Sequence, residues 1–193
     1  MKQPTKARAA SAEKQKQPPA PPTPEARRER MAQSFADIVG VLMRDPGFRN
    51  LRLADLEWLV LPPILSGQWR IARGAATSAV AAPDASGAPT KGSLIIPVAT
   101  ALWASVSPAI DKNLTEGVNE PLMLRPNEWT SGKHLWLIAV AGDRRFVPKF
   151  VKSLSESEFK GKDMKMRVNG PDGSVTVSTL ENVVEKMSAQ ASK

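Results

Sequence analysis

The chain has 193 residues, 41% of them hydrophobic, and contains no cysteine. This length suits one domain with tails, and the lack of cysteine excludes a disulfide framework, a thiol nucleophile and a cysteine-ligated zinc site. The net charge is +8, but residues 1–30 carry eight basic and three acidic side chains, so the basicity is largely a property of that segment. We expect no bound metal and no nucleic-acid partner.

The first 24 residues contain six prolines and almost no large apolar side chain. We expect a disordered tail there, and no signal peptide, because residues 1–30 contain no apolar central region. No stretch approaches the roughly 18 apolar residues that a membrane span needs. The sequence therefore predicts a cytoplasmic protein without a membrane span.

Helical spacing of apolar residues predicts a first helix that begins at Thr23-Pro24 and ends at Asp45-Pro46. A second helical segment is expected from Leu53 to about Leu65, kinked or ended by Pro62-Pro63, with Gly67 as its C-cap. A short strand over Gln68–Ala72 is then expected to lead into a flexible insertion loop over residues 73–92, which are rich in Ala, Gly, Ser and Pro.

The second half of the chain alternates strands and helices. We expect a strand at 93–105, a short helix at 108–116, a buried strand at 136–141, a helix at 147–158, a β-hairpin over 164–177 and a last helix at 180–187. This order predicts an α/β or α+β fold: a single domain over residues 25–180, with a C-terminal tail at 181–193.

Four short segments occur in an order and spacing that resemble one enzyme family. They are Asp45-Pro46-Gly47-Phe48-Arg49-Asn50; Val60-Leu61-Pro62 followed by Gly67-Gln68-Trp69; Pro97-Val98 followed by Trp103 to Ser107; and Glu128 to Ile138, which contains Trp129, Ser131, Gly132 and Trp136. Together they resemble the RTX toxin-activating lysine acyltransferases, the haemolysin C-type enzymes. The resemblance covers about residues 35–143.

The resemblance implies a fold similar to the GNAT acyltransferases, with a mixed sheet flanked by helices and splayed to admit a pantetheine arm. It also implies a reaction, in which a fatty acyl group moves from acyl carrier protein to an internal lysine of a protoxin. The donor thioester is then a substrate, with no bound cofactor. Acyl carrier protein, an RTX-type acceptor protein and a second copy of the chain, as a homodimer, are the partners that the resemblance implies.

The chain departs from this family at the catalytic positions, because the family's histidine falls on Phe48 and its supporting carboxylate on Ala139. Neither side chain can take the proton from a lysine amine. Asp143 and His134, the sole histidine, are the candidate stand-ins. Asp143 has a capping or turn role as its alternative. His134 lies five residues before Ala139, and in a regular strand this odd separation predicts opposite faces.

The resemblance also suggests residues for substrate binding, namely Arg49, Trp103, Ser131, Gly132 and Trp136. Four of them have a structural alternative: the two tryptophans suit a core, and Ser131-Gly132 suits a turn before a strand. Two functions therefore remain open. One is an acyltransferase with a replaced catalytic pair, and the other is a catalytically degenerate homologue that binds acyl carrier protein or a toxin.

Overall fold

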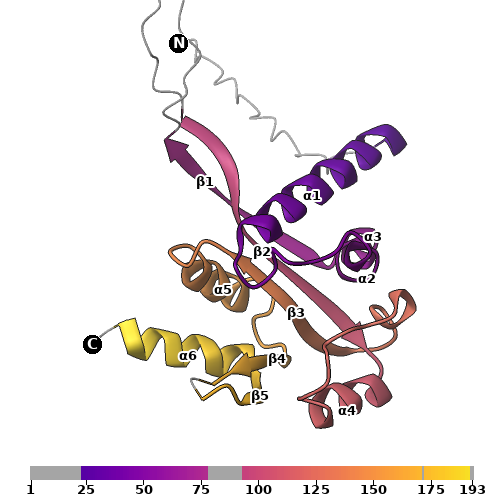
Figure 1. Cartoon of the computed structure of the whole chain (residues 1–193), viewed down its shortest axis with the longest axis vertical. Helices are drawn as coiled ribbons and strands as arrows, with labels where there is room; N and C mark the ends of the chain where they lie inside the picture. The colour runs from indigo at the N-terminus through magenta and orange to yellow at the C-terminus, as the bar shows by residue number, and fades with distance from the viewer. Residues whose placement is uncertain (1–22, 78–92, 171, 192–193) are drawn as a thin grey trace, which may run out of the picture.

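The computed structural model describes residues 23–77, 93–170 and 172–191. In this part of the chain five strands form one mixed sheet in the order β1-β2-β3-β4-β5, with helices on both faces (Figure 1). The predicted α/β class is therefore confirmed. Residues 1–22 of the expected tail (1–24) and residues 78–92 of the expected loop (73–92) lie outside the described residues.

Helix α1 (Pro24–Arg44) begins and ends where the sequence predicts. Thr23 is the N-cap, and its side chain accepts a hydrogen bond from the backbone N–H of Ala26. Pro24 occupies the first helical position, where no intrahelical acceptor for an N–H exists. Asp45 is the C-cap, so the expected stop at Asp45-Pro46 is confirmed.

The predicted second helix is two short helices, α2 (Asp55–Leu59) and α3 (Leu61–Ser66), which are divided at Val60. The expected kink or end at Pro62-Pro63 occurs just before the two prolines, at Val60, and both prolines lie in the first turn of α3. The N–H groups of a first turn lack intrahelical acceptors, so proline removes no hydrogen bond there. Gly67 caps α3 with φ of 75°, as expected.

Strand β1 (Trp69–Thr77) is longer than predicted and pairs antiparallel with β2 (Ser93–Val106). The predicted start of the loop at residue 73 is therefore too early, because residues 73–77 are paired strand. Ala72 lies opposite Ala99 and Arg73 opposite Pro97, so Val98 forms a bulge in β2. The far ends of the two strands project beyond the helices as a two-stranded ribbon (Figure 1).

The rest of the fold agrees closely with the predicted order of elements. Helix α4 (Pro108–Glu116) and a 3-10 turn η1 (Pro126–Glu128) precede β3 (His134–Gly142), which is followed by α5 (Val147–Glu156). The hairpin β4 (Met164–Asn169) and β5 (Val175–Thr179) leads into α6 (Leu180–Ala191). The expected last helix at 180–187 is therefore confirmed, and it continues to Ala191 into the segment expected to be a tail.

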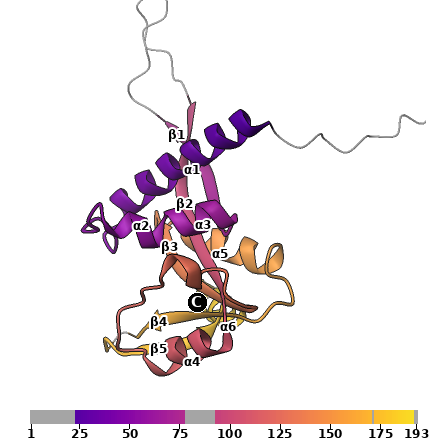
Figure 2. The same cartoon turned by 90° about the vertical axis from the view of Figure 1, so that its right-hand side faces the viewer.

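Two apolar clusters lie on opposite faces of the sheet, and the cartoons show α1 and α5 on either side of it (Figures 1 and 2). The α1-side cluster contains Ile38, Leu102 and Trp136, and the α5-side cluster contains Trp103, Leu137 and Leu154. Side chains of neighbouring strand residues point to opposite faces, so the strands β2 and β3 divide the core between the two clusters. The candidate functional residues are distributed over both.

Candidate functional site

The turn after α1 is joined to the end of β3 by the carboxylate of Asp45, which the sequence predicted only as the end of the first helix. Asp45 Oδ1 accepts a hydrogen bond from Gly47 N at 2.8 Å, and Asp45 Oδ2 accepts one from Gly142 N at 2.8 Å. The first bond is the local turn that aspartate forms with the residue two positions on. The second bond joins segments 97 residues apart, and it sets where Phe48 lies relative to β3.

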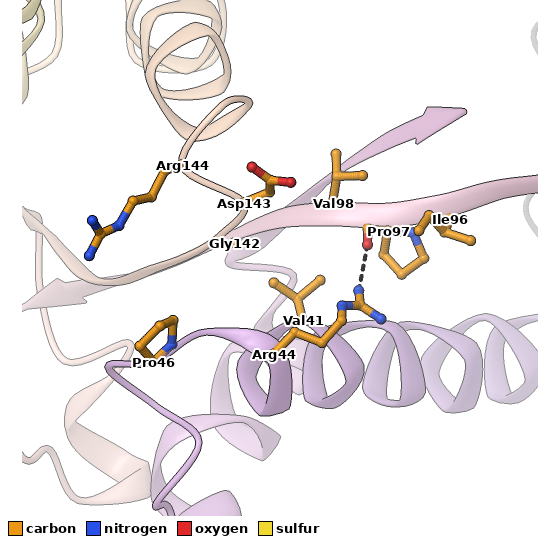
Figure 3. A pocket seen from close by; sticks show the side chains of 9 residues that line it. All are labelled: Val41, Arg44, Pro46, Ile96, Pro97, Val98, Gly142, Asp143 and Arg144. Atoms are coloured by element: carbon orange, nitrogen blue, oxygen red, sulfur yellow. Dashed lines mark hydrogen bonds between the residues drawn. The ribbon is translucent and has the colours of Figure 1, made fainter. Parts of the chain in front are cut away.

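A pocket of about 450 Å³ lies beside this junction, between the C-terminal end of α1, the bulge of β2 and the end of β3 (Figure 3). Arg44 reaches across from α1 and donates to the carbonyl oxygen of Pro97 at 2.6 Å. A Cβ atom on Gly142, whose φ is 141°, would lie 2.4 Å from Val98 O. This close approach explains why glycine ends β3.

The two positions that the resemblance aligns with the catalytic pair, Phe48 and Ala139, both pack in the α1-side cluster. Phe48 is half-buried, and Ala139 is buried opposite Leu102 of β2. Phe48 and Arg49 also line a pocket of about 220 Å³ that is otherwise mostly apolar. In this part of the fold Phe48 serves as a packing residue.

Asp143 lies just beyond β3 and lines the pocket of Figure 3. Its carboxylate accepts hydrogen bonds from the backbone N–H and the guanidinium of Arg145, and these bonds lower the pKa of Asp143 to about 2. Its backbone carbonyl accepts from Phe146 N and Val147 N at the start of α5. This geometry favours the turn and capping alternative, because so weak a base is a poor proton acceptor at neutral pH.

His134 lies at the opposite end of β3 from Asp143, so the two candidate stand-ins do not meet. The expectation that His134 and Ala139 face opposite sides is wrong, because Trp103 pairs with Leu137 and Leu102 with Ala139, which leaves Ile138 as a bulge. One extra residue reverses the alternation of side chains along the strand. His134 therefore shares a face with Trp136 and Ala139.

A carboxylate that the sequence did not single out faces His134. Asp111 of α4 accepts hydrogen bonds from Trp136 Nε1 at 2.7 Å and from Lys165 Nζ at 2.9 Å, and His134 Nδ1 lies 3.8 Å away. Burial raises the pKa of Asp111, but the hydrogen bonds from Lys165 and Trp136 outweigh it, so the net shift is downward. The sequence offered one signal for Asp111, namely an acidic residue in the first turn of a predicted helix.

The two candidate tryptophans lie on opposite faces of the sheet, so they cannot line one channel together. Trp136 is fully buried in the α1-side cluster. Trp103 packs edge-on against Phe159 in the α5-side cluster, with ring centroids 5.0 Å apart, and the Arg70 guanidinium lies 5.5 Å from its ring. Both environments agree with the core alternative for these residues.

Three of the four sequence motifs meet in one hydrogen-bonded junction. The Gln68 side-chain amide lies 2.8 Å from Ser105 Oγ, Ser105 N donates to Trp129 O at 2.8 Å, and Gly132 N donates to Ser105 O at 3.0 Å. Ser131 Oγ accepts from the N–H of Ser107 at 2.9 Å. The Ser131-Gly132 pair thus forms the turn that aligns β3 with β2, and its N–H groups are engaged within the fold.

Strands β3 and β4 diverge soon after they meet. They pair in parallel only from Leu135 with Met164 to Leu137 with Met166. A pocket of about 460 Å³ lies at this point, lined by Leu137, Ile138 and Arg167 among others. The Arg167 guanidinium donates to the carbonyl oxygens of Leu114, Gly117 and Glu120, and burial lowers the pKa of Arg167. The sheet is therefore open on one side of the bulge at Ile138.

Residues 93–180 match the model of the RTX toxin acyltransferase family. The resemblance drawn from the motifs is thus confirmed from β2 to the first residue of α6, and the family implies a toxin acyltransferase. The two earlier motifs, at 45–50 and 60–69, precede the matched segment. No curated protein matches the chain significantly.

Among the described residues, no helix is long and apolar enough to cross a membrane, and no three acidic or histidine side chains cluster as metal ligands.

Proposed function

We propose that the chain transfers a fatty acyl group from acyl carrier protein to an internal lysine of an RTX-type protoxin. The family match over residues 93–180 carries this proposal. The divergence of β3 and β4, with a pocket at Ile138, supports it because a pantetheine arm needs such an opening in the sheet. The lysine nitrogen attacks the thioester carbonyl carbon and forms the amide bond, the carbon–sulfur bond breaks and releases the pantetheine thiolate of the carrier protein, and the proton lost by the amine passes through a base or water to that thiolate.

The replaced catalytic pair predicts slow transfer. A lysine amine has an ordinary pKa of about 10.4, so it is almost wholly protonated at neutral pH. Phe48 and Ala139 offer no proton acceptor, and the loss of a general base typically costs about 10²- to 10⁴-fold in rate. Proximity of the two reactants still contributes to the rate. His134, which faces Asp111, and Asp143 are the residues to test as replacements.

The test is intact-mass spectrometry of a candidate protoxin fragment, incubated with acyl-loaded carrier protein and the full chain. A fatty-acyl mass increment on a lysine supports transfer, and peptide mapping locates the lysine. His134→Gln and Asp143→Asn then identify any base, since only loss of the true acceptor lowers the rate. Absence of the increment, under conditions in which an intact family member acylates the same fragment, refutes the proposal.

A second candidate function is that of a binding homologue without turnover, favoured by the apolar surroundings of Phe48 and Ala139. The double variant Phe48→His with Ala139→Asp is the discriminating test. Transfer that appears only in the double variant indicates that the natural chain binds its partners without catalysis. Equal transfer by both proteins refutes this second function.

A further inference from the structure

Helix α3 presents an exposed apolar side chain between two hollows. The helix lies beside α1 (Figures 1 and 2), and its residue Leu65 is 66% exposed. The first hollow, of about 530 Å³, lies between α3 and the segment that leads into β3. The second hollow, of about 420 Å³, lies between α3 and the first half of α1. Leu65 and Ser66 line both hollows and therefore form the wall that separates them.

The surface around Leu65 is apolar. Leu61, one turn earlier on α3, is 41% exposed. Met31 and Trp69, both half-buried, line the second hollow. Exposed apolar side chains that are grouped beside hollows are typical of surfaces that bind another protein. We therefore expect a partner to cover this surface.

The two hollows carry charges of opposite sign. Of the described residues, Glu57 is the charged one that lines the first hollow, and Arg27 and Arg30 are the charged ones that line the second. All three side chains are exposed. None of them forms an ion pair with another described residue. Their charges are therefore available to a partner.

This arrangement of charge is complementary to itself. In a twofold dimer both copies use the same patch, so a contact between two different residues occurs twice. A twofold axis at Leu65 places the first hollow of each copy against the second hollow of the other. Glu57 of each copy then faces Arg27 and Arg30 of the other copy. A partner with charges of one sign would instead be repelled at one end of the surface.

We propose that the chain forms a twofold dimer through this surface, which we call the α3 face. The two Leu65 side chains meet at its centre, and burial of apolar area there supplies most of the affinity. The charges at its ends fix the orientation of the two copies and disfavour other pairings. The family resemblance leaves open which surface a homodimer would use. The α3 face consists of Arg27, Arg30, Glu57, Leu61 and Leu65.

Sedimentation equilibrium of the full chain at several concentrations tests the dimer. Leu65→Asp is expected to raise the dissociation constant of the dimer by at least about tenfold, because a twofold interface loses the buried leucine twice. Leu53→Asp is the matched control, at a leucine that is 87% exposed and outside both hollows, and is expected to leave the constant unchanged. A chain that is monomeric at every concentration, or equal loss in both variants, overturns the inference.

Charge reversal tests the pairing of the two ends. Glu57→Arg alone, or Arg27→Glu combined with Arg30→Glu, places like charges against each other at both ends and is expected to weaken the homodimer. A mixture of these two proteins restores opposite charges at both ends. Native mass spectrometry of the mixture is therefore expected to show the heterodimer above its statistical share. A heterodimer at or below that share, or no dimer in the mixture, overturns the assigned orientation.

The same variants distinguish the dimer from another occupant of the α3 face. A monomeric chain that binds acyl carrier protein, with binding lost in Leu65→Asp and kept in Leu53→Asp, assigns the face to the carrier protein and overturns the dimer. The inference does not depend on acyl transfer. A dimer without transfer in the mass assay refutes only the proposed turnover, and transfer by a monomeric chain refutes only the dimer.

Discussion

Replacement of Asp45 by alanine tests whether one carboxylate holds the turn after α1 against the end of β3. Asp45→Ala removes both acceptors, for Gly47 N and for Gly142 N. The Gly47 N–H lies in an exposed turn, where water can replace the carboxylate. The Gly142 N–H lies in a partly buried contact and loses its partner, so most of the cost comes from this bond.

The magnitude follows from these two bonds. A hydrogen bond to a charged group contributes about 1.5–3 kcal/mol, and an exposed bond contributes less. We therefore expect Asp45→Ala to lower the free energy of unfolding by about 2 kcal/mol. In a domain of this size, each kcal/mol lowers the Tm by about 2–4 °C. Asp45→Asn keeps one acceptor oxygen and is expected to lose roughly half as much.

Urea unfolding, followed by tryptophan fluorescence and by circular dichroism, measures this change. Asp172→Ala is the control, because Asp172 also accepts from a backbone N–H two residues on, that of Ser174, but makes no hydrogen bond to a distant segment among the described residues. The control is expected to change stability by less than about 0.5 kcal/mol. An equal loss in both variants, or no loss in Asp45→Ala, refutes the role assigned to the bond with Gly142.

Two further predictions follow from other contacts. Asp111→Asn leaves Lys165 without its carboxylate and is expected to lower the free energy of unfolding by about 2 kcal/mol at pH 7. Because the folded-state pKa of Asp111 lies below its ordinary value of 3.8, this loss should persist above pH 3.8 and shrink as the pH falls through the folded-state pKa. A loss that is the same at pH 3 and pH 7 in urea titrations contradicts the assignment. Gly132→Ala places a Cβ atom 2.4 Å from Val106 O and should prevent β3 from aligning with β2. In the control Gly67→Ala the new Cβ atom meets open space, so the free energy of unfolding should fall by only about 1 kcal/mol because of the positive φ. Similar Tm values for the two variants would contradict this reasoning.

Local chemistry in the sequence determined the ends of several elements. Thr23, Asp45 and Gly67 act through groups within a few residues of themselves, so their capping roles can be predicted without knowledge of the fold. The hairpin of β4 and β5 is equally local, because a turn with Gly and Asp joins two short alternating segments. The motif Glu128 to Ile138 identified the family because it lies within the matched segment.

Other features depended on partners that are distant in the chain. Residues 74–77 are small, and the segment 73–77 was predicted to be loop, but it forms strand because it pairs with β2. The bulge at Ile138 arises where β3 meets β2, and it reverses the face of every later residue in β3. The sequence alone predicts a regular alternation, so it placed His134 and Ala139 on opposite faces.

The candidate site shows the same division. From the sequence alone, Phe48 and Ala139 are predicted to stand at the positions of the family's catalytic pair, because this prediction depends only on side-chain identity and order along the chain. Only the tertiary structure decided which carboxylates join distant segments of the chain. Asp45 bonds to Gly142 and Asp111 bonds to Lys165, across separations of 97 and 54 residues. Hydrogen bonds depend on distance in space, and a linear sequence carries that distance only where the interacting residues are neighbours in the chain.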